Sequence, residues 1–179
     1  MIAPPFQLSE RLKSLRKAFD EAFSSPPVVE DQDHEDILSV RIAGDPYGIR
    51  VCEMSGLVPR QPVTPVPSTV AALRGITAIR GAIIPVYSLG ELLGYGEDHE
   101  QTRWVSLFGT HEPIGLTFAL LEGYVRIHRS DLCIPGRSAV PRQHIYQVAR
   151  IGDQVRPVLS LPSIAQTIKG QSGMVGLQE

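Results

Sequence analysis

Apolar and polar residues alternate with a period of two along most of the chain after residue 37. Leu38, Val40 and Ile42 alternate with polar neighbours, the residues AGDP follow, and a second alternating run begins at Tyr47. Two such runs around a short Gly-containing turn predict a β-hairpin. Comparable runs, separated by turns rich in Gly, Pro and Asp, predict further strands at 76–79, 82–88, 103–109, 114–120, 124–128, 145–151 and 155–161. About nine short strands predict an all-β body built as barrels or a sandwich.

The longest run with a helical period lies near the N-terminus, at residues 8–23. Its apolar residues recur at alternating spacings of four and three, which is one stripe of a helix. They are Leu8, Leu12, Leu15, Phe19 and Ala22. Because so short a helix is marginal alone, it needs a surface: it either packs on its own domain or docks on a partner or a second copy. Shorter helices are predicted at 69–74 and 162–168.

Residues 24–36 carry two prolines and five acidic residues but no Lys or Arg. This composition predicts an extended, solvated linker. The chain is therefore expected to consist of an N-terminal helix and linker at 1–36, a β domain at 37–170 and a flexible tail at 171–179.

Composition narrows the class of protein. Glycine (16) and proline (15) are frequent, which favours short strands and turns over a helical bundle. The net charge of -2 provides no chain-wide footprint for nucleic acid or an anionic membrane. No stretch approaches the ~18 apolar residues that a membrane span requires, so no membrane insertion is expected. Cys52 and Cys133 lack disulfide or zinc spacing, and reduced thiols fit a cytoplasmic protein.

No combination of residues predicts catalysis. The five histidines lie in unrelated contexts, and no HExxH, GxSxG, Walker-type or GxGxxG spacing occurs. The cluster at 97–100 lacks the spacing of a calcium loop and is expected to be a solvated turn. We therefore expect a protein that is not an enzyme and that needs no metal or cofactor.

Residues 60–94 contain the most distinctive segment, in which two Arg-Gly pairs flank a short strand. Gly75 and Gly81 are expected to leave bare backbone that another chain could approach, while Arg80 offers a planar fork for a partner carboxylate or carbonyl. The alternative is a surface arginine that caps a turn. Single-stranded nucleic acid is a weaker alternative for Arg60, Arg74 and Arg80, because interleaved aromatic residues are missing.

This segment resembles the CheW domain, the coupling module of bacterial chemosensory arrays. The shared pattern is G-x-x-x-[LI]-R-G-x-x-x-P-[VI]-x-x-L, read here as Gly75, Ile79-Arg80-Gly81, Pro85-Val86 and Leu89. The resemblance extends upstream through Tyr47-Gly48-Ile49 and downstream through Ile114-Gly115-Leu116, and it covers residues 37–168.

The resemblance implies two small five-stranded SH3-like barrels packed about a shared core. It also implies a non-catalytic adaptor that couples the signalling tip of a chemoreceptor to the regulatory domain of a CheA-type histidine kinase. Gly75, Arg80 and Gly81 would then face the receptor, together with the strand positions Met54 and Gly56. The alternative is a divergent scaffold that assembles with other CheW-like domains and recruits a different partner through its N-terminal helix.

The chain also departs from the family pattern at polar positions. Met54-Ser55-Gly56 stands where the family often has Val-x-Glu, and Ala78 replaces the usual Asn. Ser88 replaces an Asp, and Phe118-Ala119 replaces a later Val-Asp. A lost interfacial carboxylate removes a charge-assisted bond of ~1.5–3 kcal/mol. These departures indicate a divergent adaptor that serves an alternative pathway or binds one of the two usual partners.

Overall fold

The chain divides into two compact units, residues 1–33 and 34–179, and the fold below is that of the second unit. The computed structural model describes residues 33–96, 103–134 and 143–173. The predicted N-terminal helix with Leu8, Leu12, Leu15 and Phe19, the acidic cluster at 97–100 and the end of the tail lie outside the described residues.

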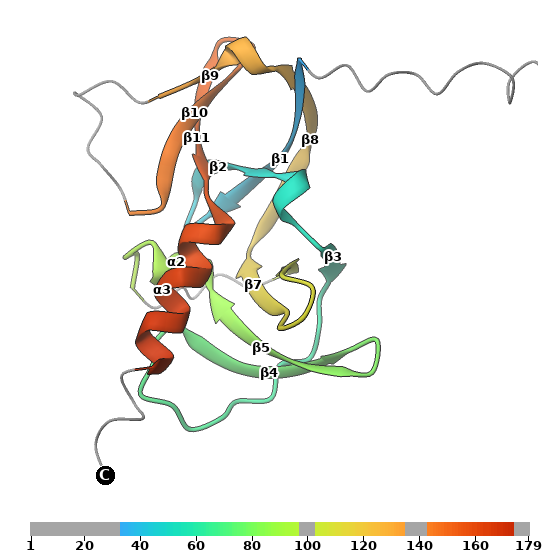
Figure 1. Cartoon of the computed structure of the whole chain (residues 1–179), viewed down its shortest axis with the longest axis vertical. Helices are drawn as coiled ribbons and strands as arrows, with labels where there is room; N and C mark the ends of the chain where they lie inside the picture. The colour runs from blue at the N-terminus through green and yellow to red at the C-terminus, as the bar shows by residue number, and fades with distance from the viewer. Residues whose placement is uncertain (1–32, 97–102, 135–142, 174–179) are drawn as a thin grey trace, which may run out of the picture. The chain divides into compact units, whose positions relative to one another are not determined.

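The first sheet has the strand order β8-β1-β2-β11-β10-β9 (Figure 1). Within it, β2 from the N-terminal part of the domain pairs in parallel with β11 from its C-terminal part. Its strands are β1 (His34–Ile42), β2 (Asp45–Arg50), β8 (Leu120–His128), β9 (Leu132–Cys133), β10 (Ile145–Ile151) and β11 (Gln154–Leu159). The predicted first hairpin is confirmed, because β1 and β2 pair from Ile42 and Asp45 around Ala43 and Gly44. The sheet has six strands instead of the expected five because the short β9 pairs with β10.

The strand β1 begins at His34, earlier than the predicted start at residue 37. Two of the five acidic residues of the predicted linker, Glu35 and Asp36, lie on this strand and are paired across the sheet. Asp36 accepts hydrogen bonds from Arg126 at 2.8 and 3.1 Å, and Glu35 lies 3.5 Å from Arg129. An acidic run can therefore be a strand when the neighbouring strand supplies arginines at matching positions.

The second sheet has the order β3-β6-β7-β5-β4. Its strands are β3 (Gly56–Pro59), β4 (Leu73–Ile79), β5 (Ala82–Ser88), β6 (Trp104–Phe108) and β7 (Ile114–Phe118). The helical elements are α2 (Leu89–Leu92), α3 (Leu161–Gly173) and the two single turns η1 (Val51–Glu53) and η2 (Arg129–Asp131).

Of the two short helices predicted for the domain, one is confirmed and one is wrong. The helix at 162–168 lies within α3. The segment 69–74 is a turn that leads into β4, in which Leu73 donates its N–H to Val70 O at 3.0 Å and pairs with Tyr87 of β5. Pairing with a neighbouring strand outweighs the weak helical propensity of six residues.

Each sheet curls around a small core of its own. In the first sheet, Ile127 of β8 packs with Ala149 of β10, although these strands are far apart in the strand order. In the second sheet, Ile79 of β4, Ile84 of β5 and Leu107 of β6 belong to one buried cluster. A core shared by strands that are not adjacent in the sheet is what a curved, barrel-like sheet encloses.

A larger cluster joins both sheets to α3. Its fully buried side chains include Tyr47 from the first sheet, Phe118 and Leu116 from the second, and Leu161 and Ile164 from α3. β1 shows how the alternating pattern serves two cores: Leu38 and Val40 enter this shared cluster, while Ile37 enters the first barrel. The expected all-β fold, with two β subdomains about a shared core, is confirmed.

Candidate functional site

The Arg80-Gly81 pair forms the two-residue turn between β4 and β5. Ile79 pairs with Ala82, and φ is +51° at Arg80 and +82° at Gly81. Positive φ at both central positions is the mirror-image type I′ turn, whose twist matches that of the flanking strands. Figure 1 shows this hairpin with its turn extending away from the rest of the second sheet.

The Arg80 side chain is exposed and makes no hydrogen bond or ion pair with any residue that the structure describes. It therefore does not cap its own turn within the described part of the chain. Ile83, on the same hairpin, is 74% exposed and pairs across the strands with exposed Ala78. The tip of the hairpin thus presents a guanidinium beside an exposed apolar pair, a combination that is common in protein interfaces.

The expected bare backbone at Gly75 is wrong, because the chain's own backbone covers this residue. Gly75 is buried with φ of +143°, and a Cβ there would lie 2.1 Å from Thr64 O. Thr64 also exchanges both backbone hydrogen bonds with Ile76, at 2.8 and 2.9 Å. The missing side chain at Gly75 therefore lets residues 62–65, a segment we call the strap, pass directly over β4. Gly81, by contrast, is exposed with open space around it.

Met54 and Gly56 lie at the other edge of the second sheet. Met54, expected at a strand position, lies outside the strand, since Val51–Glu53 forms η1 and β3 starts only at Gly56. Met54 is half-buried against the shared core, and Gly56 pairs with Leu107. Val58 of β3 packs on the buried cluster of the second sheet, next to its strand partner Val105. A binding role for these positions stays a prediction.

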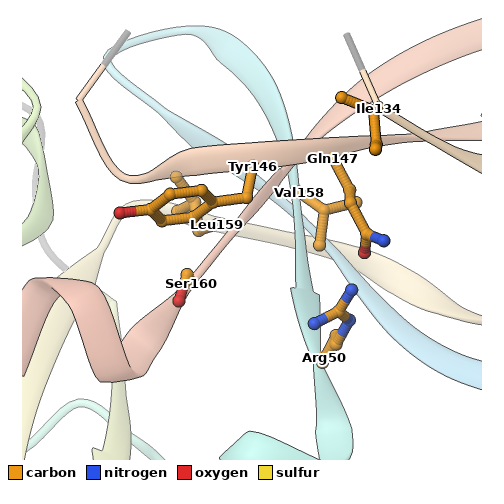
Figure 2. A pocket seen from close by; sticks show the side chains of 7 residues that line it. All are labelled: Arg50, Ile134, Tyr146, Gln147, Val158, Leu159 and Ser160. Carbon is orange, nitrogen blue, oxygen red and sulfur yellow. The ribbon is translucent and has the colours of Figure 1, made fainter.

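A second candidate surface lies on the first barrel, at a pocket of about 530 Å³ (Figure 2). Tyr146 and Ile134 form an apolar rim and are 62% and 82% exposed. Figure 2 shows the Arg50 guanidinium and the Gln147 amide pointing toward each other. The remaining lining residues are Val158, Leu159 and Ser160.

Local structure explains how this pocket forms. The register of β10 against β11 shifts between Ile145 and Gln147, and such a bulge redirects side chains. Arg50 Nη1 donates to Glu53 Oε1 at 3.2 Å, and the other oxygen of Glu53 accepts the N–H of Leu161 at the start of α3, at 2.8 Å. Sequence reasoning missed the pocket because residues from β2, β10 and β11 meet only through the sheet order.

The outer face of the first barrel is polar and ion-paired. Glu122 accepts hydrogen bonds from Arg156 and Arg41, which hold the pKa of this carboxyl below its ordinary value despite some opposing desolvation. Hydrogen bonds from Arg126, followed by a contribution from Tyr124, lower the pKa of Asp36 to about 2. These ion pairs lie on the outer face of the barrel, whereas the rim formed by Tyr146 and Ile134 is apolar and exposed.

Within residues 33–96, 103–134 and 143–173, no group of three or more His, Cys, Asp or Glu side chains could hold a metal ion. Burial raises the pKa of the Cys52 thiol, and Glu35, which accepts a hydrogen bond from it at 3.2 Å, raises this pKa further.

No helix in the described part of the chain is long and apolar enough to cross a membrane.

Comparison with known proteins places this arrangement in context. The chemotaxis protein CheW of Thermotoga maritima is 26% identical to the chain over 98 residues, which cover 54% of the chain and 65% of that relative. The crystal structure of the scaffolding protein TtCheW from Thermoanaerobacter tengcongensis matches with a TM-score of 0.63 and 21% identity, over 71% of the chain and 89% of that structure. The matched part thus falls slightly short of two thirds of the curated relative.

The family model of the CheW-like domain matches residues 36–169. This range contains both barrels, the Arg80 turn and most of α3. The chain therefore belongs to the CheW-like domain family.

Proposed function

We propose that this chain is a non-catalytic, cytoplasmic adaptor that couples the signalling tip of a chemoreceptor to the regulatory domain of a CheA-type histidine kinase. The observation that carries the proposal is the Arg80 turn: an exposed guanidinium, held on a tight hairpin, next to exposed Ile83. Arginine is enriched among the residues that dominate binding energies at interfaces.

The receptor partner fits the hairpin tip of the second barrel. A chemoreceptor tip is a bundle of helices, whose surface offers carboxylates and apolar side chains at helical spacing. Arg80 can bind a carboxylate with two parallel hydrogen bonds, while Ile83 and Ala78 pack on apolar side chains beside it. The turn fixes the backbone at Arg80, which limits the entropy lost on binding.

The kinase partner fits the pocket rim of the first barrel. Tyr146 and Ile134 expose apolar surface there, and the short β9 leaves part of the outer edge of β10 unpaired by described strands. Such an edge and rim suit the regulatory domain of a kinase, itself a β domain related to CheW. Two surfaces on different barrels allow one molecule to bind both partners.

The proposal is tested by measuring binding of the purified full chain to a receptor signalling tip and, separately, to a kinase regulatory domain. Tyr146→Ser is expected to weaken kinase binding and to leave receptor binding unchanged, because Tyr146 lies on the first barrel. Failure of the unmodified chain to bind either partner would refute the proposal. If the chain binds only the receptor, the proposed receptor site at the hairpin stands and the proposed kinase site on the first barrel is refuted.

A further inference from the structure

Three arginines line one pocket of about 370 Å³ on the second barrel. They are Arg60, Arg74 and Arg103, and Trp104, the only tryptophan of the chain, lies beside them. The other lining residues are Gln61, Val63, Pro65, Val105 and Thr117. Such a concentration of positive charge is notable in a chain whose net charge is -2.

The fold brings the arginines together from distant parts of the chain. Arg60 follows β3 and donates its N–H to Arg103 O at 2.7 Å, and Arg103 directly precedes β6. Arg74 lies on β4, at the opposite edge of the sheet.

The strap of residues 62–65 links the two edges. Thr64 is bridged to Ile76 by backbone hydrogen bonds, and Thr77 Oγ1 donates to Pro62 O at 2.7 Å. The pocket is therefore fixed on both sides by hydrogen bonds to the sheet.

Only part of the pocket's charge is neutralised inside the protein. Arg74 Nη2 lies 3.1 Å from Glu91 Oε1. Arg60 and Arg103 are exposed, and neither guanidinium has a hydrogen bond or ion pair with a residue in the described ranges. Arg60 also holds a positive φ of +25°, a strained conformation for a residue other than glycine. Two guanidiniums thus face the same pocket without a described counter-charge.

We propose that this pocket binds the phosphate group of a small phosphorylated molecule. Guanidinium forks match phosphate oxygens in pairs. A phosphate ester carries about 1.5 to 2 negative charges at pH 7, which corresponds to two unneutralised arginines. The volume lies at the small end of ligand pockets, which favours a compact ligand over a nucleic-acid strand that needs a long basic groove. The site is distinct from the Arg80 turn and goes beyond the adaptor function.

Trp104 provides the assay. The full chain is titrated with inorganic pyrophosphate at constant ionic strength, and tryptophan fluorescence is followed in parallel with isothermal titration calorimetry. Saturable binding with 1:1 stoichiometry is expected, and both Arg60→Gln and Arg103→Gln should weaken it at least about tenfold. Arg150→Gln, an exposed arginine on β10, is the matched control and should bind like the unmodified chain.

The inference is overturned if the unmodified chain does not bind pyrophosphate, or if both pocket variants bind it as well as the unmodified chain does. It is also overturned if sodium chloride at equal ionic strength gives the same signal. Single-stranded oligonucleotides serve as a further arm. Binding that tightens with oligonucleotide length and exceeds that of pyrophosphate would also overturn it, because a groove would then be the binding element. The melting temperature of each variant verifies that loss of binding does not arise from unfolding.

Discussion

At the scale of residues, Gly75 and Arg80 share one sequence motif but have different environments. Arg80 is exposed on a turn, as expected for a contact residue, whereas Gly75 lies under backbone of its own chain. The glycines of the motif indicate turns or unusual backbone conformations near both positions, and φ is positive at both. The motif could not predict the approach of Thr64, which depends on a strap that folds back from another part of the chain.

Gly75→Ala is expected to destabilise the domain strongly. The added Cβ would lie 2.1 Å from Thr64 O, and φ of +143° is unfavourable for alanine. We expect the free energy of unfolding in urea to fall by about 2–4 kcal/mol. Gly81→Ala is the matched control, since open space surrounds Gly81 and only its φ of +82° is strained, and it should cost about 1 kcal/mol. Equal losses at the two glycines would contradict the structural role of Gly75.

His144 is expected to make stability depend on pH. It is buried, its Nδ1 lies 2.9 Å from Ser163 Oγ, and burial lowers its pKa below the ordinary value of 6.5. Between the two pKa values the unfolded chain binds more protons than the folded chain, so stability falls as the pH drops below about 6.5.

Urea denaturation at several pH values checks this dependence. His144→Asn should flatten the dependence between pH 7 and the folded-state pKa, and Asn tolerates the positive φ of +71° at this position. The Asp36 carboxyl, with a pKa of about 2, titrates in a separate acidic range. An unchanged pH profile in His144→Asn would show that His144 does not cause the effect.

At the scale of elements, α3 begins at a carboxylate supplied from elsewhere in the chain. The Leu161 N–H donates to Glu53 Oε2 at 2.8 Å, and a negative charge near a helix N-terminus is favourable. Arg50 binds the same carboxylate at 3.2 Å. Glu53 therefore connects η1, β2 and α3, a connection that no local sequence signal indicates.

Glu53→Ala is expected to lower the free energy of unfolding by about 1–3 kcal/mol, because it leaves a helix N–H and Arg50 without their charged partner. Glu112→Ala is the control. Glu112 pairs with Lys169 at 3.7 Å on an exposed surface, and such pairs contribute at most about 1 kcal/mol. Urea denaturation of both variants checks the difference. Similar values for the two would mean that Glu53 does not stabilise α3.

The elements that local sequence predicts best are those with strict alternation. The hairpin of β1 and β2 follows from alternating residues and a turn with Gly44. Elements set by tertiary contacts are harder to predict: the helix expected at 69–74 is a turn and strand, and Met54, expected on a strand, follows the helical turn Val51–Glu53. The same contrast holds for the candidate binding surfaces. The exposure of Arg80 can be predicted from its position in a turn, whereas the pocket beside Arg50 depends on strands that are distant in sequence and cannot be predicted.

At the scale of the whole molecule, the two barrels cannot be treated as independent parts. Tyr47 and Leu159 from the first sheet share a cluster with Phe118 from the second and with Ile164 of α3. The fold class was predictable because strand number and the family motif agree. The pairing of parallel β2 and β11 was not, because their residues are far apart in sequence.

Removal of residues 1–33 leaves β1 complete, because the second compact unit begins at His34 and contains β1. Removal of residues 1–36 would also delete the start of β1 and should destabilise the domain. Thermal unfolding of the two truncated chains checks this difference.

Partner binding of the chain that lacks residues 1–33 then tests the alternative scaffold. Retained binding to both partners would disfavour recruitment through the N-terminal segment. Selective loss of one partner would support that alternative and would place part of the adaptor function outside the two barrels.

The most direct test is calorimetric titration of a receptor signalling tip with the full chain and with Arg80→Asn. Asn-Gly is the preferred sequence of a type I′ turn, so this variant removes the guanidinium while keeping or improving the turn. We predict about 30-fold weaker binding, or about 2 kcal/mol, with no loss of thermal stability, while Arg150→Asn binds normally. Unaltered affinity in Arg80→Asn would contradict the assignment of this turn as the receptor-binding site.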